Sequence, residues 1–212
     1  MKQRGISLIV VLVALLIIGF AAVALLRSSD TSTLTVGNLA FKRTALAAGD
    51  AGTEAAITWL ADNATSATLF DDSDADGYYA TSADACDLTG TRTPADATDD
   101  VNWTGTDPGG NCNMDALTLD AGGAIPDGYT VSYVVNRMCN AAGDPGEVFA
   151  ADHLTPMVCS SIGAGISEGS TRSAGSYGVA PLAGETQNYY RITTRIDGPR
   201  NTVRYIQVLV TL

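Results

Sequence analysis

Residues 6–26 read ISLIVVLVALLIIGFAAVALL, an unbroken apolar run in which Ser7 is the only polar side chain. A helix of this length rises about 30 Å, which is enough to cross the hydrocarbon core of a bilayer. Lys2 and Arg4 precede the run, and cations on that side of a membrane helix favour a cytoplasmic N-terminus. The sequence therefore predicts a single-pass membrane protein whose chain beyond Arg27 lies outside the cytoplasm.

A candidate processing site lies before this run rather than after it. An ordinary secretory signal has its small-residue cleavage site after the apolar core. Here Arg4 and Gly5 directly precede Ile6, so cleavage after Gly5 would leave the membrane helix on the mature protein. A plain N-terminal anchor has the same charges and the same apolar run, and these residues alone do not separate the two interpretations.

The helix is predicted to continue well beyond the membrane, to about residue 64. The chain has no proline before Pro94, so nothing obliges the helix to stop at Arg27. Small and apolar residues recur at helical spacing between residues 34 and 60, which indicates one packing stripe. Its members are Phe41, Ala45, Ala48, Gly52, Ala55 and Trp59. Alanine and glycine let another backbone approach closely. A helix over residues 6–64 would be roughly 90 Å long, with a membrane half at 6–27 and an amphipathic half at 28–64.

The N-terminal region resembles the type IV prepilins and the related pseudopilins. The match lies in Arg4-Gly5 followed by Ile6-Ser7-Leu8-Ile9, and residues 36–60, VGNLAFKRTALAAGDAGTEAAITWL, are similar to the corresponding part of PilX-type minor pilins. The resemblance covers residues 4–60 well and the remainder loosely. It implies that residues 1–5 form a leader, and that a membrane-embedded prepilin peptidase cuts between Gly5 and Ile6 and methylates the new N-terminus.

One position departs from the pattern of the major pilins, which carry a glutamate at the fifth mature residue. Counted from Ile6, that position is Val10, and no acidic residue occurs between Met1 and Ser29. A charge within the bilayer is costly and is usually kept only for a function. We therefore expect a minor subunit near a filament tip, although lineages can also simply vary here.

The composition changes after Leu60. Between Asp62 and Asp120 there are thirteen aspartates and one cation, Arg92, which predicts a solvated, loop-rich region over residues 65–125. The formal net charge of −11 disfavours an anionic partner, so no nucleic acid is expected.

Within this region Asp72-Ser73-Asp74-Ala75-Asp76-Gly77 fits D-x-D-x-D-G, the first half of a calcium loop. The candidate ligands are the carboxylates of Asp72, Asp74, Asp76 and Asp84 and the carbonyl of Tyr78. Asp84 or Asp87 would replace the usual glutamate, because Ala83 stands at the twelfth position. An ordinary aspartate-rich turn is the alternative to calcium.

Four cysteines, Cys86, Cys112, Cys139 and Cys159, lie in the exported part. Their even number and the oxidising compartment predict two disulfides, for which three connectivities exist. We favour Cys86–Cys112 and Cys139–Cys159, because these pairs close two loop regions that lack core-forming residues. The resemblance also implies a bridge near the C-terminus.

Three segments read as strands: residues 129–135, 189–196 and 202–210. Tyr129, Val131, Tyr133 and Val135 alternate on one face of the first, and the other two form a hairpin around residues 197–201. We predict an α+β fold in which the long helix packs on a small antiparallel sheet at 128–212, within a disulfide-stapled head at 65–212. The resemblance names this a pilin-like ladle.

An enzyme is not expected. Residues Gly165–Gly169 satisfy G-x-S-x-G around Ser167, but the surroundings are rich in glycine and serine, and the only histidine, His153, comes earlier in the chain. Phosphate-loop, dinucleotide and zinc motifs are absent from the sequence.

These features together predict a structural protein, a minor type IV pilin that primes or takes part in pilus assembly. It would reside in the inner membrane with its C-terminus in the periplasm and then move into a pilus. Expected partners are major and minor pilins, the prepilin peptidase, the inner-membrane assembly machinery and a contacted surface or tip adhesin. The alternatives are a pseudopilin of type II secretion and a membrane-anchored periplasmic binding protein or hydrolase.

Overall fold

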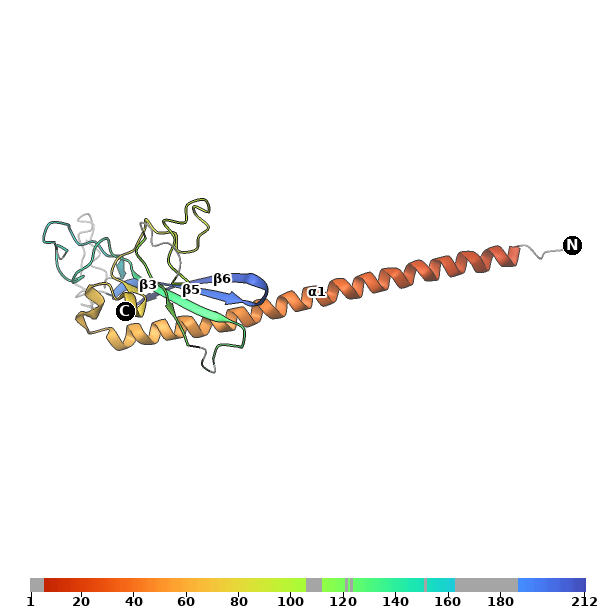
Figure 1. Ribbon diagram of the computed structural model, residues 1–212, viewed down its shortest axis with the longest axis horizontal. Helices are drawn as coiled ribbons and strands as arrows, with labels where there is room; N and C mark the ends of the chain where they lie inside the picture. The colour runs from red at the N-terminus through yellow and green to blue at the C-terminus, as the bar shows by residue number, and fades with distance from the viewer. Residues whose placement is uncertain (1–5, 106–111, 121, 123, 151, 163–186) are drawn as a thin grey trace, which may run out of the picture. The chain divides into compact units, whose positions relative to one another are not determined.

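The computed structural model describes residues 6–105, 112–120, 122, 124–150, 152–162 and 187–212. The chain divides into two compact units, Met1–Thr44 and Ala45–Leu212. A single helix, α1 (Ile6–Asn63), contributes to both units (Figure 1). In the second unit it is followed by short 3-10 turns and by the strands of one sheet.

In the first unit, the apolar side chains of α1 are exposed. The large apolar side chains between Leu8 and Leu26 are 49–73% exposed, and from Leu8 the helix is long and apolar enough to span a membrane. Residues 28–35 are mostly serine and threonine, which are modest helix formers. Here the hydroxyls of Thr31, Thr33 and Thr35 donate to the carbonyls four residues earlier, so each hydroxyl is hydrogen-bonded within the helix. The helix beyond the apolar run is thus continuous, as predicted.

The described residues of the second unit contain a mixed six-stranded sheet. Its centre consists of β3 (Thr130–Arg137), β5 (Gln187–Gly198) and β6 (Thr202–Thr211), with β5 antiparallel to both neighbours. The predicted hairpin is present, and the 3-10 turn η3 (Pro199–Asn201) joins its strands. Three two-residue strands complete the sheet: β1 (Tyr78–Tyr79), β2 (Leu117–Thr118) and β4 (Ser161–Ile162).

The expectation of a purely antiparallel sheet is wrong, because β1 pairs with β3 in parallel. The turn η2 (Asp74–Asp76) ends at Gly77, whose φ of +65° reverses the chain just before β1. The Gly77 carbonyl then accepts a hydrogen bond of 2.8 Å from the amide of Val135. A side chain at position 77 would also meet the Tyr133 carbonyl at 2.9 Å, so the turn requires glycine.

One face of the sheet is covered by α1 from Ala45 onward (Figure 1). A Cβ at Gly52 would lie 2.5 Å from Val131 Cγ1, which shows how closely the helix approaches β3. Of the predicted stripe, Ala45, Ala48 and Gly52 are buried, and two members are only half-buried, Ala55 and Trp59. Phe41, in the first unit, is 41% exposed. The buried positions of the last turns are instead Ala56 and Leu60.

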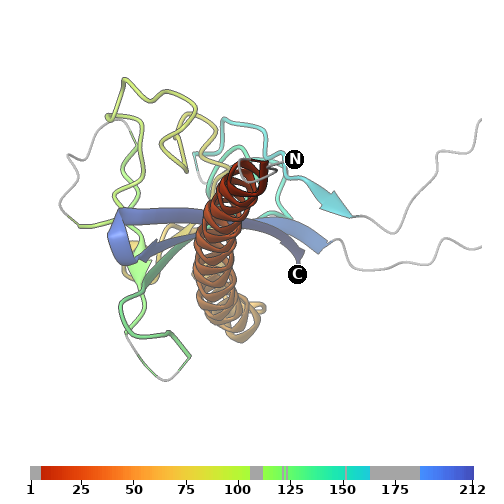
Figure 2. The same cartoon turned by 90° about the vertical axis from the view of Figure 1, so that its right-hand side faces the viewer.

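The loops between β1 and β2 form a second core on the other face of the sheet; Figure 2 shows these yellow-green loops beside the blue strands β5 and β6. Its buried residues are Tyr79, Leu88, Val101, Trp103, Cys112, Met114 and Val134. Seven of the eight residues of β3 are buried, because both of its faces are covered. Tyr133 and Val135 pack in the core that contains Ala56 and Leu60, while Val134 points into the loop core.

Candidate functional site

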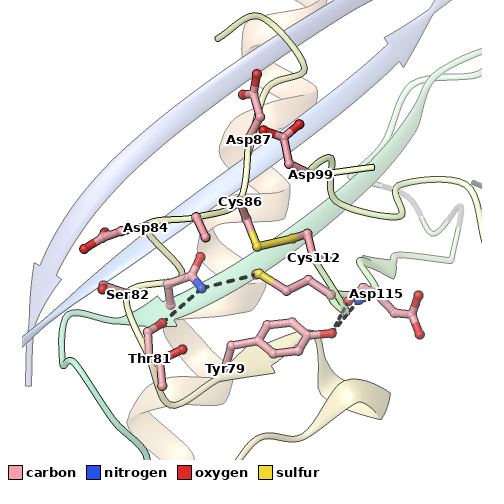
Figure 3. The surroundings of a disulfide bond; sticks show 12 residues. Tyr79, Thr81, Ser82, Asp84, Cys86, Asp87, Asp99, Cys112 and Asp115 are labelled. Atoms are coloured by element: carbon pink, nitrogen blue, oxygen red, sulfur yellow. Dashed lines mark hydrogen bonds between the residues drawn. A yellow bond between two sulfur atoms is a disulfide. The ribbon is translucent and has the colours of Figure 1, made fainter. Parts of the chain in front are cut away.

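The cysteines form the two bridges Cys86–Cys112 and Cys139–Cys159, the neighbour pairing expected from the sequence. Figure 3 shows the first bridge in the loop core beside Tyr79. The Tyr79 hydroxyl donates to the Asp115 carbonyl at 3.0 Å and accepts from the Asp115 amide. The bridge and this pair of hydrogen bonds fix the acidic loops to β1, so a chain segment with few apolar residues acquires a defined structure.

Asp87, beside this bridge, organises the next loop, a role that its sequence context did not indicate when it was considered as a possible calcium ligand. The residue is only 3% exposed. Its Oδ1 accepts from the amide and hydroxyl of Thr89, and its Oδ2 accepts from the amides of Arg92 and Thr93. Burial raises the pKa of this carboxyl, but the hydrogen bonds together outweigh burial and leave the pKa below its ordinary value.

The D-x-D-x-D-G segment forms a tight turn that its own hydrogen bonds close. Ser73 and Tyr78 pair through both of their backbone amides, at 2.8 and 3.0 Å. The Ser73 hydroxyl donates to Asp76 Oδ2 at 2.6 Å, and the amide of Ala80 donates to Asp72 Oδ1 at 2.7 Å. The aspartates at this spacing therefore stabilise a turn and the start of β1.

In this arrangement the five predicted calcium ligands do not form a ligand set. Asp72 and Asp76 accept hydrogen bonds from different protein groups, the Tyr78 carbonyl accepts from Ser73, and Asp84 lies in the next loop. Within the described ranges, no three His, Cys, Asp or Glu side chains are grouped closely enough to hold a metal ion. The calcium loop stays a prediction from sequence, and the turn gives it no support.

Arg137, at the end of β3, is a second residue whose role the sequence did not reveal. It is fully buried, and its guanidinium donates to four backbone carbonyls. The acceptors are Leu69, Ala80, Ala141 and Gly143, at 2.8 to 3.3 Å. These carbonyls belong to the segment after α1, the end of β1 and the loop after β3. One cation thereby joins three segments that share no regular secondary structure.

The segment closed by Cys139–Cys159 carries a small hairpin on the surface. Backbone hydrogen bonds join Val148 to Met157 and Ala150 to Thr155. Asp152 stabilises its tip by accepting from the hydroxyl and amide of Thr155 and from the amide of Leu154, and these bonds lower its pKa to about 2. The hairpin exposes four large apolar side chains: Val148, Phe149, Leu154 and Val158.

Two sequence predictions lie outside the described residues. One is the leader with Gly5; the backbone of Ile6 begins α1. The other is the G-x-S-x-G segment around Ser167.

Comparisons with protein-family models, with curated proteins and with solved structures found no match to this chain. The chain is thus defined by its own features: a membrane-length apolar helix and an α+β unit with a mixed sheet and two disulfides.

Proposed function

We propose that this chain is a minor type IV pilin, a structural subunit that primes or joins a pilus near its tip. One observation carries the proposal: α1 is a single helix of 58 residues whose first part is uniformly apolar and exposed and whose last part packs on a disulfide-bonded α+β unit. An apolar helix with this exposure requires a bilayer or other apolar helices around it. A pilin uses both environments in turn.

The proposed mechanism is assembly. The apolar part of α1 holds the subunit in the inner membrane until the prepilin peptidase cuts after Gly5. The freed helix then packs laterally against the helices of other pilins, and the disulfide-bonded unit is displayed outside the cell. Small residues along α1, such as Gly19 and Gly37, support close lateral packing, because a Cβ at either would meet no other atom within 4 Å in this chain.

Val10 supports a minor rather than a major role. The major pilins place a glutamate at this mature position, and the described helix has no acidic residue before Asp30. In the pilin family that glutamate pairs with the N-terminal amine of the neighbouring subunit, and this chain has no carboxylate at the position to make the contact. Such a subunit suits the tip, where assembly begins.

The proposal is tested by deleting the gene and complementing it in trans. We expect piliation to fall in the deletion strain, and the protein to occur in sheared filaments of the complemented strain but not of a strain lacking the prepilin peptidase. Normal piliation with a loss of protein secretion would instead identify a pseudopilin. No change in either process, with the protein confined to membranes, would identify an anchored periplasmic protein.

A further inference from the structure

Strand β6 forms an open edge of the sheet. Within the described ranges it pairs with β5 alone, in one continuous register over Thr202–Thr211. Just beyond this ladder, Asn188 and Leu212 exchange both of their backbone hydrogen bonds, at 3.0 and 3.2 Å. Hydrogen-bonded pairs alternate along an antiparallel ladder, so the even-numbered residues of β6 bond to β5. The odd-numbered residues point their amides and carbonyls away from β5. These outward residues are Val203, Tyr205, Gln207, Leu209 and Thr211.

The outward backbone groups have no hydrogen-bond partner among the residues that the structure describes. Proteins usually protect such an edge with lysine, proline, a bulge or a charge that points towards the core. Strand β6 contains no lysine, proline, glycine or acidic residue, and its register with β5 has no bulge. Its one charged residue, Arg204, is exposed. The edge therefore keeps the properties of a strand that can pair with one more strand.

The side chains along this edge define the segment that would fit it. In an antiparallel addition, Arg204, Ile206 and Val208 occupy non-hydrogen-bonded positions, where directly opposed side chains lie closest together. Arg204 forms no ion pair with the described residues, so an acidic side chain opposite it complements its charge. Ile206 and Val208 are half-buried, and β-branched side chains opposite them extend the apolar surface. The edge thus selects an extended segment with β-branched residues and one acid.

The direction of α1 favours a different protein over a second copy of this chain. Gly49 of α1 lies against Ile206, and Val210 packs on the cluster that contains Ala56 and Leu60. Helix α1 and strand β6 therefore run in the same direction. If two β6 strands paired antiparallel, their α1 helices would run in opposite directions. Such an arrangement does not suit two copies that are anchored by α1 in one membrane.

From this edge we propose that β6 binds an extended segment of another protein as an added antiparallel strand. The backbone of the segment pairs with the outward amides and carbonyls of β6 and supplies the affinity. Its side chains supply the specificity, through an acid opposite Arg204 and β-branched residues opposite Ile206 and Val208. The inference does not depend on the proposed pilin function, because an anchored periplasmic protein with this sheet would have the same edge.

The test uses the full-length ¹⁵N-labelled protein in detergent micelles and the peptide acetyl-VTVTVTET-amide, whose glutamate falls opposite Arg204. One form is N-methylated on the second and third valines, whose amides face away from β6 in this register. The other is N-methylated on the second and third threonines, whose amides face β6. We expect the first form to slow hydrogen exchange of the Tyr205, Gln207 and Leu209 amides saturably, by about tenfold or more. The second form should not slow it, and the amides of Ile206 and Val208 should exchange slowly throughout.

Two variants at one outward position add a second test. Gln207→Pro removes an outward N–H without breaking the ladder with β5, so it should abolish peptide binding. Gln207→Thr keeps that N–H and, like the proline variant, loses the hydrogen bond from Gln207 to Thr193, so it is the matched control and should bind normally.

The peptide pair needs no variant, so its result stands whether or not Gln207→Pro folds. The proposal is overturned if the outward amides are already protected in the free protein, if both peptide forms bind or neither does, or if a folded Gln207→Pro protein binds like the wild type. A dimer that protects the same amides would assign the edge to a second copy and would also overturn it.

Discussion

Single polar residues hold together the loop-rich part of this protein, and Asp87 is the clearest example. Its folded-state pKa is depressed, so its stabilising contribution is present at pH above the unfolded pKa of about 3.9 and is lost as the pH falls through the folded pKa. Asp87→Asn should lower the free energy of unfolding by about 1 to 3 kcal/mol at pH 7, because an amide N–H₂ would face the amides of Arg92 and Thr93.

The check is chemical denaturation of wild type and variant at a series of pH values. The difference in unfolding free energy should shrink as the pH falls below about 4. Asp96→Asn is the control: Asp96 also accepts from a threonine, Thr98, but is exposed, so its replacement should have a much smaller effect. A difference that is independent of pH would show that the charge of Asp87 is not what stabilises its loop.

Arg137 leads to a second prediction at a single residue. Arg137→Met keeps most of the volume but leaves four carbonyls without their donor, so we expect a loss of about 3 kcal/mol or more. Arg204→Met, on the exposed side of β6, should stay close to wild type. Equal thermal midpoints for the two variants would contradict the role assigned to Arg137.

Sequence patterns reveal apolar periodicity and cysteine number well. They reveal poorly which polar side chains form hydrogen bonds with backbone groups. The long helix, the three main strands and the cysteine pairing follow from such patterns. Asp87 and Arg137 were missed because their partners are backbone groups of distant or irregular segments, which no spacing identifies. Strand β1 was missed because two residues are too few to show an alternation.

Among the secondary-structure elements, the contact between α1 and the sheet depends on glycine. A Cβ at Gly52 would collide with Val131 Cγ1 and lie 2.7 Å from Thr194 Cγ2. We expect Gly52→Ala to destabilise the second unit by about 1 to 2 kcal/mol, although alanine is the better helix former by about 1 kcal/mol. Thermal unfolding, monitored by near-ultraviolet circular dichroism, measures this change in stability. Gly37→Ala is the control, since its Cβ meets nothing, and it should not lower the transition. A stabilised Gly52→Ala protein would show that the helix does not pack as described.

The turn before β1 decides between the two interpretations of the aspartate spacing. A turn closed by the Ser73–Asp76 and Ala80–Asp72 hydrogen bonds predicts the same thermal midpoint in EGTA and in millimolar calcium. A calcium loop predicts a rise in the midpoint with calcium, which Asp74→Asn should abolish. From the structure we expect calcium to leave the thermal midpoint unchanged. A saturable rise of the midpoint with calcium would support a calcium site in this turn.

For the whole molecule, the exposed apolar part of α1 leads us to expect tight membrane association, even though the chain carries a formal net charge of −11. All 23 acidic residues follow the apolar run, and a strongly negative net charge favours solubility of the folded unit through charge repulsion. We expect cell membranes washed in alkaline carbonate or high salt to retain the protein, and detergent to release it. Release by carbonate alone would contradict a helix that spans the bilayer.

The pilin proposal depends on how the chain begins after maturation. Its decisive measurement is the mass of the N-terminal peptide, taken from native membranes and from sheared filaments. The proposal predicts a peptide that starts at N-methylated Ile6 in both fractions. An intact Met1 terminus, in cells that contain an active prepilin peptidase, would contradict the proposal and leave a membrane-anchored periplasmic protein.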